Sequence, residues 1–142
     1  MSLFNTDRVL VPVDFSQASF EAQAQTLAFL DNPSKLHVLH VLPRLSPVEP
    51  GRMWNTIDDR NRKTHVQQAF RQRFPEPEYE RVNFEVAIGE PSTAILDYAK
   101  AQSIDLIIIP SRGQCGIGRF LLGSVAERVI RYAKCPVLVL RR

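Results

Sequence analysis

The sequence is poor in cysteine and lacks a long hydrophobic run. Its 142 residues contain two cysteines, Cys115 and Cys135. Two cysteines are too few for a disulfide scaffold, and their separation does not match the spacing of zinc or redox sites. No apolar run approaches the roughly 18 residues of a membrane-spanning helix. Residues 1–8 do not resemble a secretory signal, so we expect a cytoplasmic protein.

An excess of charge of one sign is also missing. The formal net charge is +3, with 23% charged and 44% hydrophobic residues. This balance is ordinary for a globular domain and argues against intrinsic disorder. The small positive excess permits an anionic partner but does not require one. The length matches one domain, so we interpret residues 1–142 as a single domain.

Short β-branched runs alternate with helical patterns along the chain. The predicted strands cover residues 8–13, 36–42, 82–87, 105–109 and 136–140. The predicted helices cover residues 18–30, 53–74, 93–101 and 120–133. Such alternation predicts an α/β fold with a parallel sheet between two helical layers. Ligands of these sheets bind beyond the carboxyl ends of the strands, where the strand order reverses.

Helical spacing also predicts which side chains face the core. The predicted inward stripes are Phe20, Ala24, Leu27 and Ala28; Ile57, Val66, Ala69, Phe70 and Phe74; Ile95, Leu96 and Ala99; and Leu122, Val125, Ala126, Val129, Ile130 and Ala133. In the second helix we expect Arg60, Arg62, Lys63, Arg71 and Arg73 to face water. These basic residues lack an aromatic stacking platform, so we do not expect nucleic-acid binding.

A glycine-rich segment, residues 111–118, follows the fourth predicted strand. Glycines 113, 116 and 118 leave backbone N–H groups accessible, and Arg112 and Arg119 add positive charge. Such amides at a helix start attract anions such as phosphate. The segment is not a Walker A loop, and Leu121 replaces the third glycine of a dinucleotide fingerprint. On spacing alone, a phosphate loop and a flexible turn remain open.

Taken together, the motifs resemble the universal stress protein family over essentially the whole chain. The resemblance rests on residues 9–16, 36–41, 89–91, 105–109, 111–113, 122–129 and 135–139. With right-handed crossovers, it implies a flavodoxin-like three-layer sandwich whose five parallel strands lie in the order 3-2-1-4-5. It also implies a homodimer formed through the last strand, Val137–Leu140.

The ATP-binding branch of that family carries the pattern Gly-x2-Gly-x9-Gly-Ser/Thr. Gly113, Gly123 and Ser124 match its second half, whereas Pro110 replaces its first glycine. Proline has no N–H and a fixed φ, so weaker nucleotide binding is expected if that glycine contacts the ligand.

The resemblance implies an ATP site, with magnesium or manganese accompanying the phosphates. The implied binding residues are Pro12, Val13, Asp14, Val41, Ile109, Arg112, Gly113, Gly123, Ser124 and Val125. Asp14 would accept a hydrogen bond from the nucleotide, and the Val41 backbone would meet the adenine. Glycines 113 and 123, with Ser124 and Val125, would surround the phosphates. The alternative for Asp14 is a helix cap.

The expected function is that of an ATP-binding regulator of the stress response rather than an enzyme. No histidine is placed near Ser16, Ser111 or Ser124 to activate a nucleophile. His37 and His40 are three apart in a strand, so they point to opposite faces and cannot share a metal. A dimeric scaffold that has lost nucleotide binding is one alternative, because of Pro110. A slow ATPase is another.

Overall fold

The computed structural model describes residues 4–45, 58–111 and 123–141. Its five strands are β1 (Val9–Pro12), β2 (Leu36–Leu42), β3 (Asn83–Ile88), β4 (Leu106–Pro110) and β5 (Val137–Leu140). They form one parallel sheet in the order β3-β2-β1-β4-β5, which confirms the predicted order. The described helices are α1 (Gln17–Phe29), α3 (Asp59–Arg73), α4 (Pro91–Ala101) and α5 (Ser124–Tyr132), with 3-10 turns η1 (Pro33–Lys35) and η2 (Pro77–Arg81).

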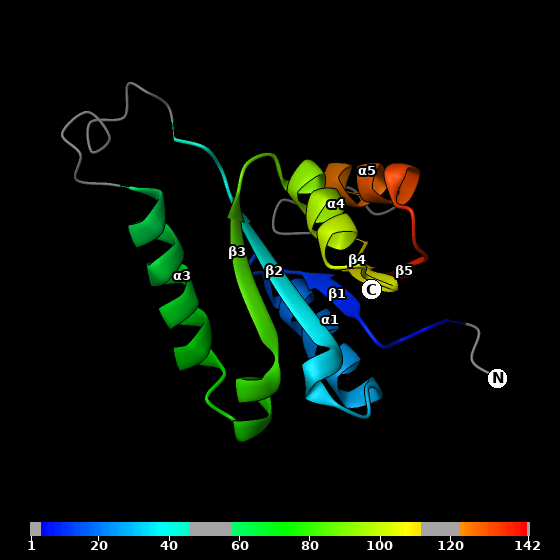
Figure 1. Ribbon diagram of the computed structural model, residues 1–142, viewed down its shortest axis with the longest axis horizontal. Coiled ribbons are helices and arrows are strands. Elements are labelled where there is room, and N and C mark those ends of the chain that lie inside the picture. Colours follow the sequence, from blue (N-terminus) through cyan, green and yellow to red (C-terminus); the bar gives the residue numbers. More distant parts are fainter. Residues whose placement is uncertain (1–3, 46–57, 112–122, 142) are drawn as a thin grey trace.

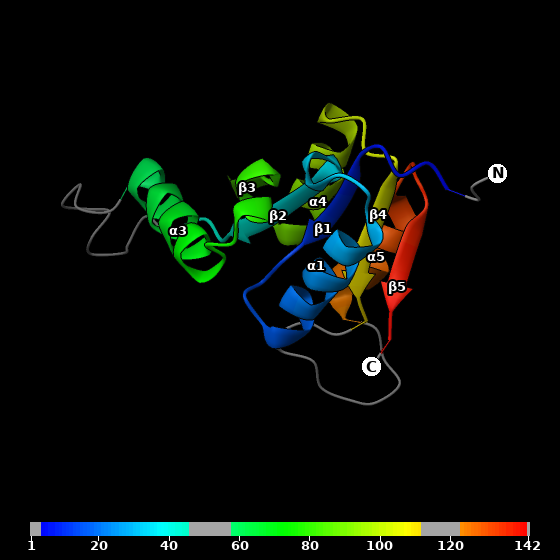
Figure 2. The ribbon, with the colours of Figure 1, turned by 90° about the horizontal axis from the view of Figure 1, so that it is seen from below.

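Helices cover both faces of the sheet. Helix α1 lies on one face, α4 and α5 lie on the other, and α3 stands beside the edge strand β3 (Figures 1 and 2). The central strands are buried on both faces because alternate side chains point to opposite layers. In β1, Val9 and Val11 pack toward α1, whereas Leu10 packs toward α4 and α5. Full burial of each such side chain contributes about 1.5–3 kcal/mol.

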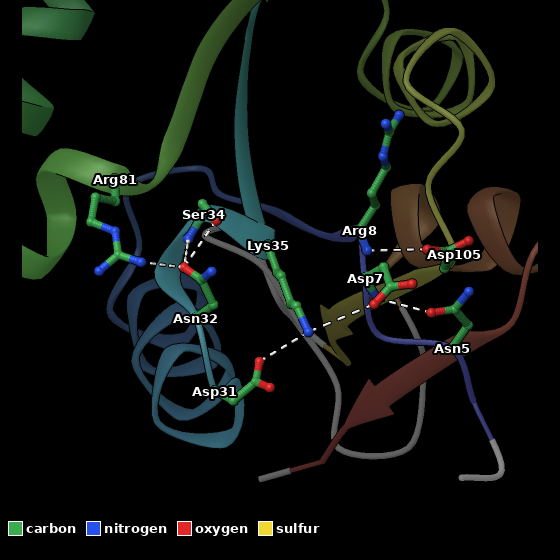
Figure 3. Close-up of polar contacts among 9 residues, drawn as sticks. All are labelled: Asn5, Asp7, Arg8, Asp31, Asn32, Ser34, Lys35, Arg81 and Asp105. Carbon is green, nitrogen blue, oxygen red and sulfur yellow. Dashed lines mark hydrogen bonds and ion pairs between the residues drawn. The ribbon is translucent and has the colours of Figure 1, made fainter.

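Polar contacts tie the amino-terminal ends of the strands together (Figure 3). The backbone N–H of Arg8 donates to Oδ2 of Asp105 at 3.1 Å, just before β1 and β4 begin. The ammonium of Lys35, before β2, lies 3.0 Å from Asp31 and 3.6 Å from Asp7. These contacts hold the incoming segments at this edge of the sheet.

Three of the four described α-helices begin two or more residues from their predicted starts, whereas α1 begins one residue early, at Gln17. Helix α3 starts at Asp59, because Asp58 has an extended backbone and its Oδ1 accepts from the Asn61 N–H at 2.7 Å. Helix α4 starts at Pro91, two residues early. Helix α5 starts at Ser124, because Gly123 has ψ 153° and is not helical. The predicted starts at 53 and 120 lie outside the described residues, but neither helix is continuous through these caps.

Several predicted inward residues are exposed. Ala24, Ala28 and Ala69 face solvent, and Ile130 is 41% exposed. Conversely, the Arg62 side chain is only 15% exposed and donates to the Pro43 carbonyl.

The buried face of α1 explains the first of these errors. It consists of Ser19, Phe20, Ala22, Gln23, Thr26 and Leu27. Its polar members can be buried because they form hydrogen bonds. Thr26 donates to the Ala22 carbonyl at 2.7 Å, and Gln23 donates to the Tyr79 hydroxyl at 3.3 Å. An apolar stripe therefore could not locate this face.

Candidate functional site

Two prolines end the pairing between β1 and β4. The strand order reverses between these two strands, because β2 and β3 lie on one side of β1 and β4 and β5 lie on the other. Only two residue pairs, Val9–Leu106 and Leu10–Ile107, join these strands, whereas four pairs join β1 to β2. Alternate residues of a parallel strand direct their N–H groups to opposite neighbours. By this register, the nitrogens of Pro12 and Pro110 face the β1–β4 side and have no hydrogen to donate. The ladder therefore stops at the switch point.

Pro110 is the last residue of β4, one position beyond the predicted strand end at residue 109. It pairs in register with Leu140 of β5, and the next N–H, that of Ser111, donates to the Leu140 carbonyl at 2.9 Å. Its ring costs β4 no hydrogen bond with β5. In the family pattern Pro110 takes the place of a glycine. In the structure it also helps to end the β1–β4 ladder.

Asp14 follows β1 and organises the turn into α1. Its Oδ1 accepts from the Ser16 N–H at 3.0 Å, and its own N–H donates to the Ser19 hydroxyl at 3.3 Å. Phe15 has φ 64°, a left-handed conformation that is uncommon for a residue other than glycine. The N-cap of α1 is Ser16, whose hydroxyl accepts from the Ser19 N–H at 3.2 Å. The cap alternative for Asp14 is therefore wrong, although Asp14 supports the capped turn.

The amino terminus of α5 differs from those of the other described α-helices. Helices α1, α3 and α4 are each capped by a side chain, from Ser16, Asp58 and Glu90 respectively. At α5 the N-cap is Gly123, which has no side chain to accept from the first-turn N–H groups. Those N–H groups and the helix dipole favour a negatively charged ligand.

Gly123 connects this helix start to the end of β4. Its N–H donates to the Ser111 carbonyl at 3.0 Å. A Cβ placed on Gly123 would approach only that carbonyl, at 3.9 Å, and φ is −62°. The backbone therefore does not require glycine here, and among the described residues no closer atom would meet a side chain at this position.

The structure brings most of the predicted binding residues to one edge of the sheet. Pro12 ends β1 and is followed by Val13 and Asp14, Val41 lies near the end of β2, and Ile109 precedes Pro110 in β4. Gly123, Ser124 and Val125 begin α5, beside the end of β4. Arg112 and Gly113 lie outside the described residues. Within the described part of the chain, no three His, Cys, Asp or Glu side chains cluster as metal ligands.

The two strand histidines lie on opposite faces, as predicted. His37 contacts the Tyr98 hydroxyl of α4 through Nδ1 at 2.7 Å. Burial, together with the nearby Arg8 charge, lowers the pKa of His37. Burial also raises the pKa of Tyr98 to about 12, with a smaller contribution from Glu85. This pair has a neutral hydrogen bond under α4 and takes no part in the candidate site.

His40 is the residue at the candidate site that sequence reasoning missed. Its Nδ1 lies 2.8 Å from the Val13 carbonyl, and its ring packs edge-on against Phe15 with centroids 4.8 Å apart. A histidine directly before the predicted adenine-contacting residue was the available signal. Its significance depended on the register between β1 and β2, which the sequence pattern did not specify.

A cavity of about 410 Å³ lies elsewhere, between α3 and β3. It is lined by Thr64, Gln67, Gln68, Arg71 and Phe84. None of the residues predicted for nucleotide binding lines it. Within the described ranges, no helix is long and apolar enough to cross a membrane.

Comparisons with known proteins identify the family. The model of the universal stress protein family matches residues 5–141. Universal stress protein MJ0531 of Methanocaldococcus jannaschii is 31% identical over 141 residues, covering 95% of this chain and 82% of that protein. The structure of UspA from Lactobacillus plantarum matches with a TM-score of 0.75 and 28% identity, over 96% and 99% of the two chains. The chain belongs to the universal stress protein family.

A further solved structure has this fold. A universal stress protein in complex with cAMP matches with a TM-score of 0.58 over 94% of this chain and 96% of that one. Its sequence identity is 19%, so the likeness concerns the fold.

Proposed function

We propose that this universal stress protein binds an adenine nucleotide, ATP with magnesium or manganese, and acts as a nucleotide-dependent regulator of the stress response. The observation that carries the proposal is the uncapped start of α5 beside the strand ends where the β1–β4 ladder stops. It provides N–H donors for phosphate at the switch point, where ligands of open α/β sheets bind. The cAMP complex of a protein with this fold supports an adenine nucleotide as the ligand class.

The proposed contacts follow from the chemistry of the described residues. The Ser124 hydroxyl and the N–H groups of the first turn of α5 would bind phosphate oxygens. The carboxylate of Asp14 would accept from a ribose or base donor. The peptide groups of Val41 would meet the adenine. The metal would neutralise phosphate charge when bound, and Asp14 is the acidic side chain of the predicted set.

A calorimetric titration with Mg-ATP, with GTP as the control nucleotide, tests the proposal. The sharpest variant is Gly123→Asp, which supplies the missing cap and places a negative charge where phosphate would bind. We expect it to stabilise the fold by a few tenths of a kcal/mol. We expect ATP affinity to fall at least about tenfold, because like charges repel there.

The matched control is Asn61→Asp, which adds the same charge to the first turn of the capped helix α3. It should leave ATP affinity unchanged. Absence of ATP binding at millimolar concentration by the folded wild-type protein would contradict the proposed function. Equal affinity in wild type and Gly123→Asp would contradict the phosphate position.

The alternative function is a dimeric scaffold without nucleotide binding. This alternative remains because Pro110 occupies the position of the first glycine in the ATP-binding pattern. In addition, β5 is an edge strand on which Leu138 is 40% exposed. An exposed apolar edge is suited to pairing with a second copy. Light scattering should give the mass of a dimer, and Leu138→Lys should shift it toward the monomer. Slow ATP hydrolysis and a cytoplasmic location remain predictions.

A further inference from the structure

The Val13 carbonyl accepts a hydrogen bond from a side chain where the β1–β2 ladder would place a backbone donor. The Val13 N–H donates to the Leu39 carbonyl at 2.8 Å, one step beyond the last registered pair. In a continued parallel ladder, the Val13 carbonyl would accept from the Val41 N–H. Instead it lies 2.8 Å from Nδ1 of His40. Because a carbonyl only accepts, this contact requires the imidazole proton on Nδ1.

The peptide groups of Val41 consequently remain outside the ladder. The Gly89 N–H donates to the Leu42 carbonyl, so Leu42 faces β3 and its neighbour Val41 faces β1. β1 has already ended at Pro12, opposite Leu39. Within the described residues, no backbone hydrogen bond joins Val41 to Val13. One N–H donor and one carbonyl acceptor therefore point together toward the end of β1.

Packing holds the imidazole of His40 in this position. The ring is half-buried and meets the Phe15 ring at an interplanar angle of 72°. Phe15 in turn packs edge-on against Phe20 of α1, with centroids 5.1 Å apart. The left-handed conformation of Phe15 is locally strained, and this packing must offset the strain. This arrangement is fixed before any ligand arrives.

We propose that His40 is a positioning residue for nucleobase recognition, because it occupies the Val13 carbonyl and so leaves the Val41 peptide groups for the base. The inference rests on the proposed nucleotide site. The Val41 N–H would donate to a ring nitrogen of adenine, and its carbonyl would accept from the exocyclic amine. Guanine presents the oxygen O6 where adenine presents this amine. The Val41 pair therefore favours adenine.

Two substitutions separate the hydrogen bond of His40 from its packing. His40→Phe keeps an aromatic ring but loses the donor. His40→Asn loses the ring but can place an amide N–H near the position of Nδ1. We expect His40→Phe to weaken ATP binding about tenfold and to reduce the preference for ATP over GTP. We expect its affinity for tripolyphosphate, which has no base, to change less than twofold. His40→Asn should restore most of the ATP affinity.

Hydrogen exchange of the Val41 amide provides a readout without ligand. In His40→Phe the Val13 carbonyl becomes available to the Val41 N–H, so protection of that amide should increase about tenfold over wild type. In His40→Asn it should stay near the wild-type value. Circular dichroism and thermal melting show whether each variant is folded.

Three results would overturn the inference. One is an equal loss of ATP and tripolyphosphate affinity in His40→Phe, which would indicate general disruption. Another is failure of His40→Asn to recover affinity when it is folded. The third is unchanged exchange of the Val41 amide in His40→Phe. If the wild type binds no ATP, the proposed function fails, and the exchange measurement still decides whether His40 controls the Val41 amide.

Discussion

The two ends of the sheet differ in how their backbone groups are satisfied. At the amino-terminal ends, side chains and incoming segments cross-link neighbouring strands, as the Arg8–Asp105 and Lys35–Asp7 contacts show (Figure 3). Arg8 also donates from its guanidinium to the Gln102 carbonyl at 2.8 Å. At the carboxyl ends, prolines end the β1–β4 ladder. His40 contacts the Val13 carbonyl, which would otherwise continue the β1–β2 ladder. Polar contacts close the amino-terminal edge, whereas at the carboxyl edge the Val41 peptide groups stay outside the β1–β2 ladder.

The same sheet can therefore serve stability at one end and, as we propose, ligand binding at the other. Buried backbone groups almost always find partners, so a ladder that stops early marks a place where a ligand or water supplies them. The amino-terminal edge should therefore respond to substitution through stability. The carboxyl edge should respond through ligand affinity, with smaller effects on folding.

The strongest test of this contrast compares Asp14→Asn with Asp7→Asn, one at each end of β1. The amide oxygen introduced by Asp14→Asn can still accept from the Ser16 N–H, so the turn should persist while the charge is lost. We expect ATP affinity to fall at least about tenfold, because a hydrogen bond to a charged group contributes about 1.5–3 kcal/mol. Asp7→Asn should leave affinity unchanged in the same calorimetric assay. Equal effects of the two variants would break the comparison.

Pro110→Gly tests whether the proline weakens the site. It restores an N–H on the β1–β4 side, so ATP affinity should rise severalfold if that group reaches the ligand. The free energy of unfolding should fall by about 1 kcal/mol, because glycine makes the unfolded chain more flexible. Pro136→Gly, at the amino-terminal edge, is the control, with a similar loss of stability and no change in affinity. Unaltered affinity in Pro110→Gly would mean that the nucleotide does not use this N–H.

At the amino-terminal edge, Arg8→Ala should act only on stability. It removes the guanidinium donor to the Gln102 carbonyl, so we expect a loss of about 1 kcal/mol in a urea titration. Arg60→Ala, at an exposed arginine of α3, should change stability by less than half as much. A change in ATP affinity in Arg8→Ala would show that the two ends of the sheet are coupled.

The smallest expected effect concerns the cap of α4. Hydrogen bonds from the Ser92 hydroxyl and the Thr93 N–H hold the pKa of Glu90 at about 2, below its usual 4.5. A lowered folded-state pKa stabilises the protein above about pH 4.5, and this contribution is lost between pH 4.5 and 2. Glu90→Gln should therefore cost about 0.5 kcal/mol at neutral pH and almost nothing at or below pH 2.

Chemical denaturation over this pH range measures the difference between wild type and Glu90→Gln. Glu78→Gln, an exposed substitution in η2, is the control and should show no such pH dependence. A difference for Glu90→Gln that persists at pH 2 would contradict the charged cap.

Much of the fold could be predicted because it depends on local pattern. The runs of apolar residues in β1 and β4 are buried on both faces, so they are hydrophobic whatever their neighbours. Helix faces were less predictable. Gln23 and Thr26 are buried in α1 through hydrogen bonds, one of them to Tyr79, which is 56 residues away. Ala24 and Ala28 then remain exposed despite their apolar spacing.

The candidate site shows the same division. The loops that leave the strand ends, Pro110 in place of glycine, and the Gly123–Ser124 pair are visible in the sequence. The start of α5 was misplaced, because the non-helical ψ of Gly123 goes with its hydrogen bond to Ser111. That contact joins the first residue of the glycine-rich segment to a residue beyond its end, so no short sequence window reveals it.

The sequence by itself determined the alternation of strands and helices, the two prolines that cannot donate to a ladder, and the glycine that cannot cap α5. These follow from the covalent chemistry of single residues and from local periodicity. Tertiary structure alone decided the register that sets His40 against the Val13 carbonyl and leaves Val41 beyond the end of β1. Register depends on how whole strands pack against both helical layers, and its effects reach residues that the chain separates by 27 positions.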